Sequence, residues 1–174
     1  MRGTFLGVAA AVLLPIAAGA VSIDVVDVGD LGNAPDPLNT NSVPGIGSVS
    51  YNYSIGTYEV FNSQYVDFLS SVATVGDTFG LYNTSMGSSA RGGISRTGAG
   101  TTGDPYVYSS KLDMGDKPVN YVSFWDAARF ANWLHNDQPT GAQGPGTTED
   151  GAYINVGNQT TFVRQPGAKF FIPT

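Results

Sequence analysis

The chain has 174 residues and a formal net charge of -6, with 8 Lys and Arg residues against 14 Asp and Glu. This length corresponds to one domain, since globular domains have roughly 100–200 residues. The few scattered basic residues give no surface suited to a phosphate backbone, so we expect no nucleic-acid partner. The absence of cysteine excludes disulfides, thiolate metal sites and a cysteine nucleophile within this chain, and the single histidine excludes a multi-histidine metal site.

The first twenty residues are typical of a signal peptide. Met1-Arg2 gives a basic start, Phe5 to Ala18 an apolar run, and Ala18-Gly19-Ala20 a small-x-small cleavage site. The alternative is an N-terminal membrane anchor, but the apolar run is shorter than the ~20 residues that span a bilayer. We therefore predict a signal peptide at residues 1–20 and a secreted or cell-surface protein, with no membrane span after its removal. The acidic, cysteine-free composition fits a bacterial export route.

Two strands are predicted in the first third of the mature chain. Apolar side chains alternate in residues 21–25 and, more clearly, in residues 48–55, where polar Ser and Asn fill the other face. The apolar positions of the second strand are Val49, Tyr51, Tyr53 and Ile55. Frequent Gly and Pro predict a loop over residues 29–47 between the strands.

Two helices are predicted from helical spacing of apolar residues. Asn62 can cap a helix over residues 63–72. Ser123 can cap a second helix, because its hydroxyl can accept a hydrogen bond from the backbone N–H of Asp126. This helix is predicted to end at about His135. The apolar face of the second helix is expected to contain Phe124, Ala127, Ala128, Ala131 and Leu134.

The opposite side of the second helix carries two tryptophans. Trp125 and Trp133 lie four residues either side of Arg129, which predicts a cation–π contact between the guanidinium and an indole. Since both sides of this helix are apolar, we expect it to be central to the domain. We expect His135 to complement the helix C-terminus through its charge or a hydrogen bond, in preference to a ligand role.

The remaining segments are rich in glycine and polar residues. Residues 85–104 and 136–150 are predicted to be loops, and their glycines lack the strand and helix context of a nucleotide-binding loop. Residues 152–156 are predicted to form a short strand. The apolar run 169–174 is an unusual ending, because natural termini are usually polar, and we expect it to mark an interrupted domain with exposed apolar surface.

Three motifs in order resemble the formylglycine-generating enzyme, or sulfatase-modifying factor, superfamily. Residues 117–134 read Lys-Pro-Val-Asn-Tyr-Val-Ser-Phe-Trp-Asp-Ala-Ala-Arg-Phe-Ala-Asn-Trp-Leu, similar to the family's Pro-Val-x-x-Val-Ser-aromatic-x-Asp-Ala signature and the helix that follows it. Residues 58–69 are similar to the family's Glu-Val-Thr-Asn-x-Gln helix, with Phe61 in place of the threonine. Residues 171–174, Phe-Ile-Pro-Thr, are similar to the start of its Leu-Pro-Thr-Glu-x-Glu-Trp motif.

This resemblance implies an α+β fold that is a variant of the C-type lectin fold, with little regular secondary structure and long loops. Residues 21–174 would be the N-terminal portion of such a domain, truncated at its C-terminus. In catalytic members the copper-binding cysteines and the calcium ligands lie beyond the Leu-Pro-Thr motif. No catalytic or cofactor-binding residue of the family therefore carries over to this chain, and its metal ligands remain unassigned.

Two groups of side chains are weaker candidates for ligand binding. Glu149 and Asp150 with nearby carbonyls form a candidate cation site, against the alternative of a solvated loop. Tyr51, Tyr53 and Trp125 are candidates for stacking on sugars, against the alternative of core packing.

Two functions follow as hypotheses. The first is a non-catalytic extracellular module that binds a protein or glycan or serves surface display, which the lack of cysteine and the long loops favour. The second is a formylglycine-generating oxidase that acts on sulfatase cysteines with copper, its catalytic residues lying in a further C-terminal part. Copper held by thiolates requires cysteines, so their presence downstream would decide between the two.

Overall fold

The computed structural model describes residues 20–37 and 47–173. The predicted signal peptide, up to residue 19, and residues 38–46 of the predicted loop lie outside this described part. Within it the chain forms short helices and three separate two-stranded antiparallel sheets, which confirms the predicted α+β class. The elements are β1 (Val25–Val28), β2 (Tyr53–Gly56), α1 (Asn62–Val72), α2 (Ser85–Ser88), β3 (Ile94–Thr97), β4 (Val107–Ser110), α3 (Phe124–His135), β5 (Tyr153–Ile154) and β6 (Val163–Arg164).

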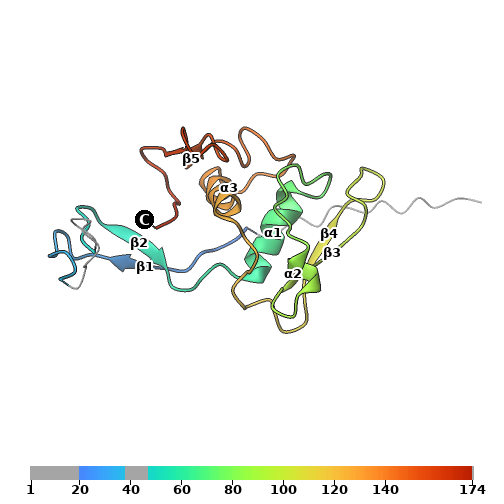
Figure 1. The fold of residues 1–174 in the computed structure, drawn as a ribbon, viewed down its shortest axis with the longest axis horizontal. Coiled ribbons are helices and arrows are strands. Elements are labelled where there is room, and N and C mark those ends of the chain that lie inside the picture. The colour runs from blue at the N-terminus through green and yellow to red at the C-terminus, as the bar shows by residue number, and fades with distance from the viewer. Residues whose placement is uncertain (1–19, 38–46, 174) are drawn as a thin grey trace, which may run out of the picture.

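The core forms where α1 packs against α3 at the centre of the molecule (Figure 1). The ring of Phe68 in α1 lies 5.3 Å from that of Phe130 and 5.2 Å from that of Trp133 in α3, measured between ring centroids. All three side chains are buried. Because each aromatic ring removes a large apolar area from water, this cluster holds the two helices together.

The start of α3 follows the prediction closely. The Ser123 hydroxyl accepts a hydrogen bond from the Asp126 backbone N–H at 3.2 Å, and the Asp126 carboxylate accepts one from the Ser123 N–H at 2.9 Å. This reciprocal arrangement satisfies two backbone donors that the first turn would otherwise leave without partners. The predicted apolar face is confirmed for Ala128, Ala131 and Leu134, which are buried, and wrong for Phe124, which is exposed.

The start of α1 differs from the prediction, because Asn62 does not cap the helix. The N-cap is Phe61, whose backbone N–H donates to the Gln64 side-chain carbonyl at 2.8 Å. Asn62 is instead the first helical residue, and its buried amide donates to the carbonyls of Met114 and Lys117. The side chain therefore fixes the segment that leads into α3.

The first predicted strand is displaced along the chain. Residues 21–25 were expected to be extended and paired, but β1 begins only at Val25. The backbone N–H and C=O of Val21 are bonded to the side-chain amide of Gln138, at 2.6 and 2.8 Å, and so are not available for a strand partner. Val21 is buried against the core all the same, which explains the apolar alternation.

The second predicted strand is shorter than its sequence pattern. Residues 48–55 alternate, but β2 contains only Tyr53–Gly56, since β1 supplies only four residues to pair with.

In the last third of the chain the predicted elements agree better with the structure. Residues 136–150 contain no helix or strand, and β5 lies inside the predicted strand 152–156, paired with the unpredicted β6.

The prediction of a loop over residues 85–104 is wrong. This segment contains α2 and β3, and β3 pairs with β4, which the sequence also failed to indicate. Ile94 in β3 is fully buried. A Cβ at Gly93 would lie within 2.5 Å of the Asn62 side chain. Gly93 was one reason to predict a loop here, but in the structure it permits close packing against α1.

Three tyrosines of this core donate their hydroxyls to backbone carbonyls. Tyr65 bonds Leu81, Tyr82 bonds Ile94 and Tyr108 bonds Ala73. Burial raises the pKa of all three phenols above the ordinary value. The folded protein therefore keeps these phenols protonated at a pH where the unfolded chain loses the protons.

We expect the free energy of unfolding to fall as the pH rises above about 10, the ordinary pKa of tyrosine. Below that pH the contribution of these phenols is constant. Urea denaturation at intervals from about pH 8 to about pH 11.5 measures the fall, and Tyr65→Phe should reduce its slope. Tyr58→Phe, at an exposed position, is the control and should leave the slope unchanged. A stability that is flat through this range would contradict the prediction.

Candidate functional site

An open groove of about 1310 Å³ lies between the β1–β2 hairpin, one side of α3 and the segment 164–173. Figure 1 shows the hairpin extending from the helices, with the end of the chain between the two. The residues that line the groove belong to these three walls and to the connection after β2, residues 57–60. Large concave surfaces of this kind are the usual places for ligands.

The helix wall of the groove is apolar. It consists of Ala127, Phe130, Ala131 and Leu134. Phe130 also packs against α1, so one side chain belongs to both the core and the groove. The two alanines leave space for a chain or ligand to approach the α3 backbone.

The hairpin wall carries the side chains that the sequence placed on one face. Val26 lies opposite Ile55 and Val28 opposite Tyr53, so these four residues share a face of the two-stranded sheet. Of the four, Tyr53 and Ile55 line the groove. Ile55 remains 39% exposed and Val26 49% exposed. Val28 and Tyr53 on the same face are half-buried, so this apolar face is only partly covered by the rest of the domain.

The third wall is fixed by two hydrogen bonds. His135 Nδ1 accepts from the Lys169 backbone N–H at 3.1 Å, and the Tyr153 hydroxyl accepts from the Ile172 N–H at 2.8 Å. The Arg164 guanidinium lies 4.4 Å from the centre of the Phe171 ring. His135 therefore makes a hydrogen bond as predicted, but to the segment after β6, so its predicted role in complementing the C-terminus of α3 is not confirmed. The predicted exposure of the apolar run is wrong, since its apolar side chains 170–172 are half-buried.

The structure separates the three aromatic residues predicted to stack on sugars. Tyr51 and Tyr53 both line the groove, with ring centroids 6.1 Å apart in an edge-to-face arrangement. Trp125 does not line it, because its ring packs at 5.0 Å from Phe162 and 5.2 Å from Phe124. Only the two tyrosines therefore remain candidates for contact with a ligand.

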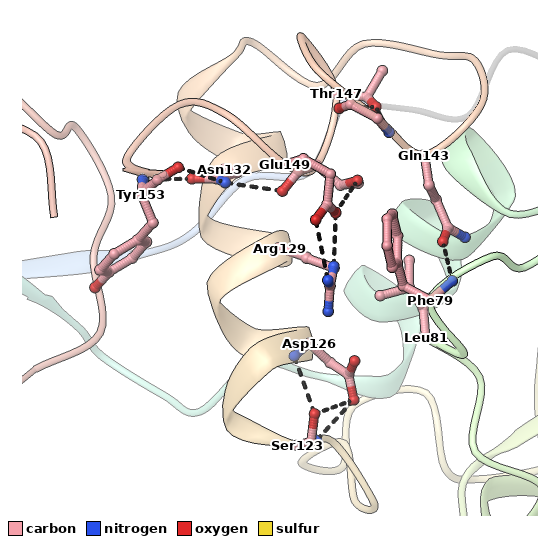
Figure 2. A network of polar contacts seen from close by, with 12 residues as sticks. Phe79, Leu81, Ser123, Asp126, Arg129, Asn132, Gln143, Thr147, Glu149 and Tyr153 are labelled. Carbon is pink, nitrogen blue, oxygen red and sulfur yellow. Dashed lines mark hydrogen bonds and ion pairs between the residues drawn. The ribbon is translucent and has the colours of Figure 1, made fainter. Parts of the chain in front are cut away.

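A largely buried ion pair packs against α3 one turn before the core residue Trp133 and beside Phe79 and Leu81 (Figure 2). Arg129 donates through Nε and Nη2 to the two carboxylate oxygens of Glu149, at 2.7 and 3.1 Å. Its guanidinium also lies 4.1 Å from the centre of the Phe79 ring. The predicted contact of Arg129 with a tryptophan is wrong, because Glu149 and Phe79 surround the guanidinium.

Asn132 joins the same loop to α3 one turn further on. Its amide donates to the carbonyls of Thr148 and Tyr153, at 2.9 and 3.0 Å, and accepts from the Tyr153 N–H at 2.7 Å (Figure 2). Asn132 and Thr148 are fully buried. Together with the ion pair, this side chain attaches the glycine-rich loop and β5 to the helix.

These contacts give Glu149 a structural role. Its carboxylate accepts hydrogen bonds from Arg129 and from the Thr148 hydroxyl, and is therefore engaged within the protein where the cation site with Asp150 was predicted. The alternative of a solvated loop describes the exposed Asp150 but not Glu149, which is half-buried. In residues 20–37 and 47–173, no group of three His, Cys, Asp or Glu side chains is placed to hold a metal ion. Copper held by thiolates does not fit this chain, which has no cysteine.

Sequence reasoning missed the groove itself. The signals were present, because the alternation of residues 48–55 and the apolar run 170–172 both describe its walls. What the sequence did not indicate was that these two segments lie beside the same face of α3 and enclose a groove there.

The family of the chain follows from a profile comparison. A profile described as the sulfatase-modifying factor enzyme 1-like domain matches residues 16–157. The chain therefore belongs to this family of sulfatase-modifying-factor-like domains, as the motifs in residues 58–69 and 117–134 indicated. The third motif, residues 171–174, lies outside the matched range and stays a prediction. Searches of curated proteins and of solved structures each gave no match.

None of the helices in the described residues has the length and apolar character that crossing a bilayer requires.

We expect Glu149→Ala to lower the free energy of unfolding by about 3 kcal/mol, because it leaves the Arg129 guanidinium buried without a carboxylate. Asp150→Ala, at the exposed neighbouring position, is the matched control and should change stability by less than about 0.5 kcal/mol. Urea denaturation of both variants measures the difference. Equal small effects would show that the ion pair carries no structural role, and a calcium-dependent rise in melting temperature that is lost in Glu149→Ala would restore the cation site.

Proposed function

We propose that this protein is an exported, non-catalytic member of its family that binds a protein or glycan ligand outside the cell. Residues 1–20 act as the signal peptide in this proposal, and residues 21–174 belong to a variant of the C-type lectin fold. The observation that carries it is the open groove. Its walls are largely apolar and include Tyr51 and Tyr53, which together offer a surface for binding.

The side chains around α3 support a binding role over a catalytic one. The charged and amide side chains that α3 buries hold the helix start, the loop and β5. These side chains are all engaged in structural contacts, and none of them is a free nucleophile or base that faces the groove. A fold is often kept when a catalytic function is lost, so family membership alone does not require an enzyme.

The alternative is the formylglycine-generating oxidase of the same family. Here residues 21–174 are the N-terminal portion of a longer domain, and copper and calcium are bound in a C-terminal part that supplies the catalytic residues. The exposed apolar side chains of the β1–β2 hairpin favour this alternative, because further polypeptide of the same domain would cover them.

The binding role predicts a ligand whose capture depends on the groove. A glycan array and a library of displayed peptides, each probed with the secreted protein, should give a hit that Ile55→Asp abolishes. Leu112→Asp is the matched control, since Leu112 is an exposed apolar residue outside the groove, 90% exposed, and should not change the signal. Binding that neither substitution alters would place the site elsewhere.

The oxidase alternative is tested separately with a cysteine-containing sulfatase peptide. Mass spectrometry measures loss of the cysteine and appearance of formylglycine in the presence of copper and oxygen. Because this alternative places the catalytic residues in a further C-terminal part, the assay uses the product of the whole reading frame. Conversion by that product would overturn the binding role, and no conversion would exclude the oxidase.

A further inference from the structure

One edge of the β1–β2 hairpin has backbone groups without partners in the described part of the chain. The Thr57 N–H donates to the Asp24 carbonyl at 2.8 Å, in the same register as the β1–β2 pairs. Bonded pairs alternate along an antiparallel ladder, so Val26 pairs with Ile55 through hydrogen bonds and Val28 with Tyr53. The backbone groups of Ser54 and Gly56 therefore point away from β1.

This unpaired edge belongs to the groove. All four residues of β2 line it, whereas β1 contributes only Val25. The outer side of β2 therefore faces the space between the hairpin, α3 and the segment 164–173 (Figure 1). Backbone N–H and C=O groups that alternate along an edge are a template for another strand.

We propose that the groove binds an extended segment of a partner protein, which adds to the free edge of β2 as a third strand. This inference rests on the binding role proposed above and names the class of ligand. The partner's backbone bonds the N–H and C=O groups of Ser54 and Gly56, and its alternate side chains lie against the apolar wall of α3.

The charges of the groove select the partner further. Arg164 and Lys169 line the wall opposite β2, where Lys169 Nζ is already paired with Asp137 at 3.0 Å, and Glu59 is the acidic side chain among the lining residues. Arg164 contacts the Phe171 ring and has no carboxylate partner in the described residues. A neutral or acidic segment, apolar at alternate positions, therefore complements the groove better than a basic one.

The same features argue against a glycan and against a second copy of the chain. A glycan offers no regular row of backbone donors and acceptors to match the edge of β2. The folded hairpin of a second copy is wider than a single extended segment, and the segment 164–173 already bounds the groove on its other side.

The test begins with a phage-displayed library of short linear peptides, selected on the full secreted chain. The expected result is a family of sequences with apolar residues at alternate positions and no net positive charge. The best peptide is then synthesised with a single N-methyl group at each position in turn. Strand addition predicts that N-methylation weakens binding about tenfold at every second position and little in between, because only alternate N–H groups bond the edge.

A protein variant tests the same bonds from the other side. Ser54→Pro removes one outward N–H of β2, which an edge position tolerates, and should weaken peptide binding about tenfold. Ser54→Ala keeps that N–H while it removes the hydroxyl that bonds Asp27, and is the matched control with unchanged binding. If Ser54→Pro fails to fold by circular dichroism, the N-methyl series still decides.

Three results would overturn the inference. No selected peptide, or peptides whose binding is indifferent to N-methylation, would exclude strand addition. A glycan that binds and is lost in Ile55→Asp would keep the binding role while overturning the peptide ligand. Dimers in sedimentation that Ser54→Pro dissociates would assign the edge to a second copy.

Discussion

A helix enclosed on two sides has to satisfy every polar side chain that it buries, and this requirement organises the structure around α3. Asp126, Arg129 and Asn132 are all buried. Each finds its partner in a different segment: the helix start, the loop at Glu149, and β5. Because a buried polar group without a partner is costly, these contacts decide where a glycine-rich loop with no regular structure has to lie.

The ion pair is an anchor for the loop in this arrangement, and its contribution depends on both partners being present. Arg129 and Glu149 lose water when they are buried, and their attraction must offset that loss. The Thr148 hydroxyl and the Phe79 ring add contacts to the pair from two sides. Arg129 and Glu149 are residue types typical of cation or catalytic sites, but here they stabilise the domain.

The sequence predicts the elements that depend on local contacts. The start of α3 was predictable because Ser123 and Asp126 satisfy each other within one turn, and α1 because its apolar spacing matches a helix. The errors lie where a distant residue decides. The Gln138 side chain bonds the backbone of Val21. Glu149, and not a tryptophan, contacts the Arg129 guanidinium. Asn62 bonds the segment before α3. None of these partners is within helical or hairpin distance in the chain, so spacing rules contain no information about them.

The groove is the consequence of the same geometry. The core occupies one side of α3 and the ion pair with its loop another, while β5 and residues 170–172 cover Ala131, so the hairpin and the end of the described chain enclose a groove beside Ala127. A free strand edge beside an exposed apolar face invites uncontrolled association, and natural proteins usually cover or charge such edges. Here the edge residues of β2 are a serine and a glycine, and neither blocks an incoming strand with charge or bulk. An edge left in this state is consistent with a surface that is covered when the protein performs its function, by a partner or by further polypeptide of its own domain.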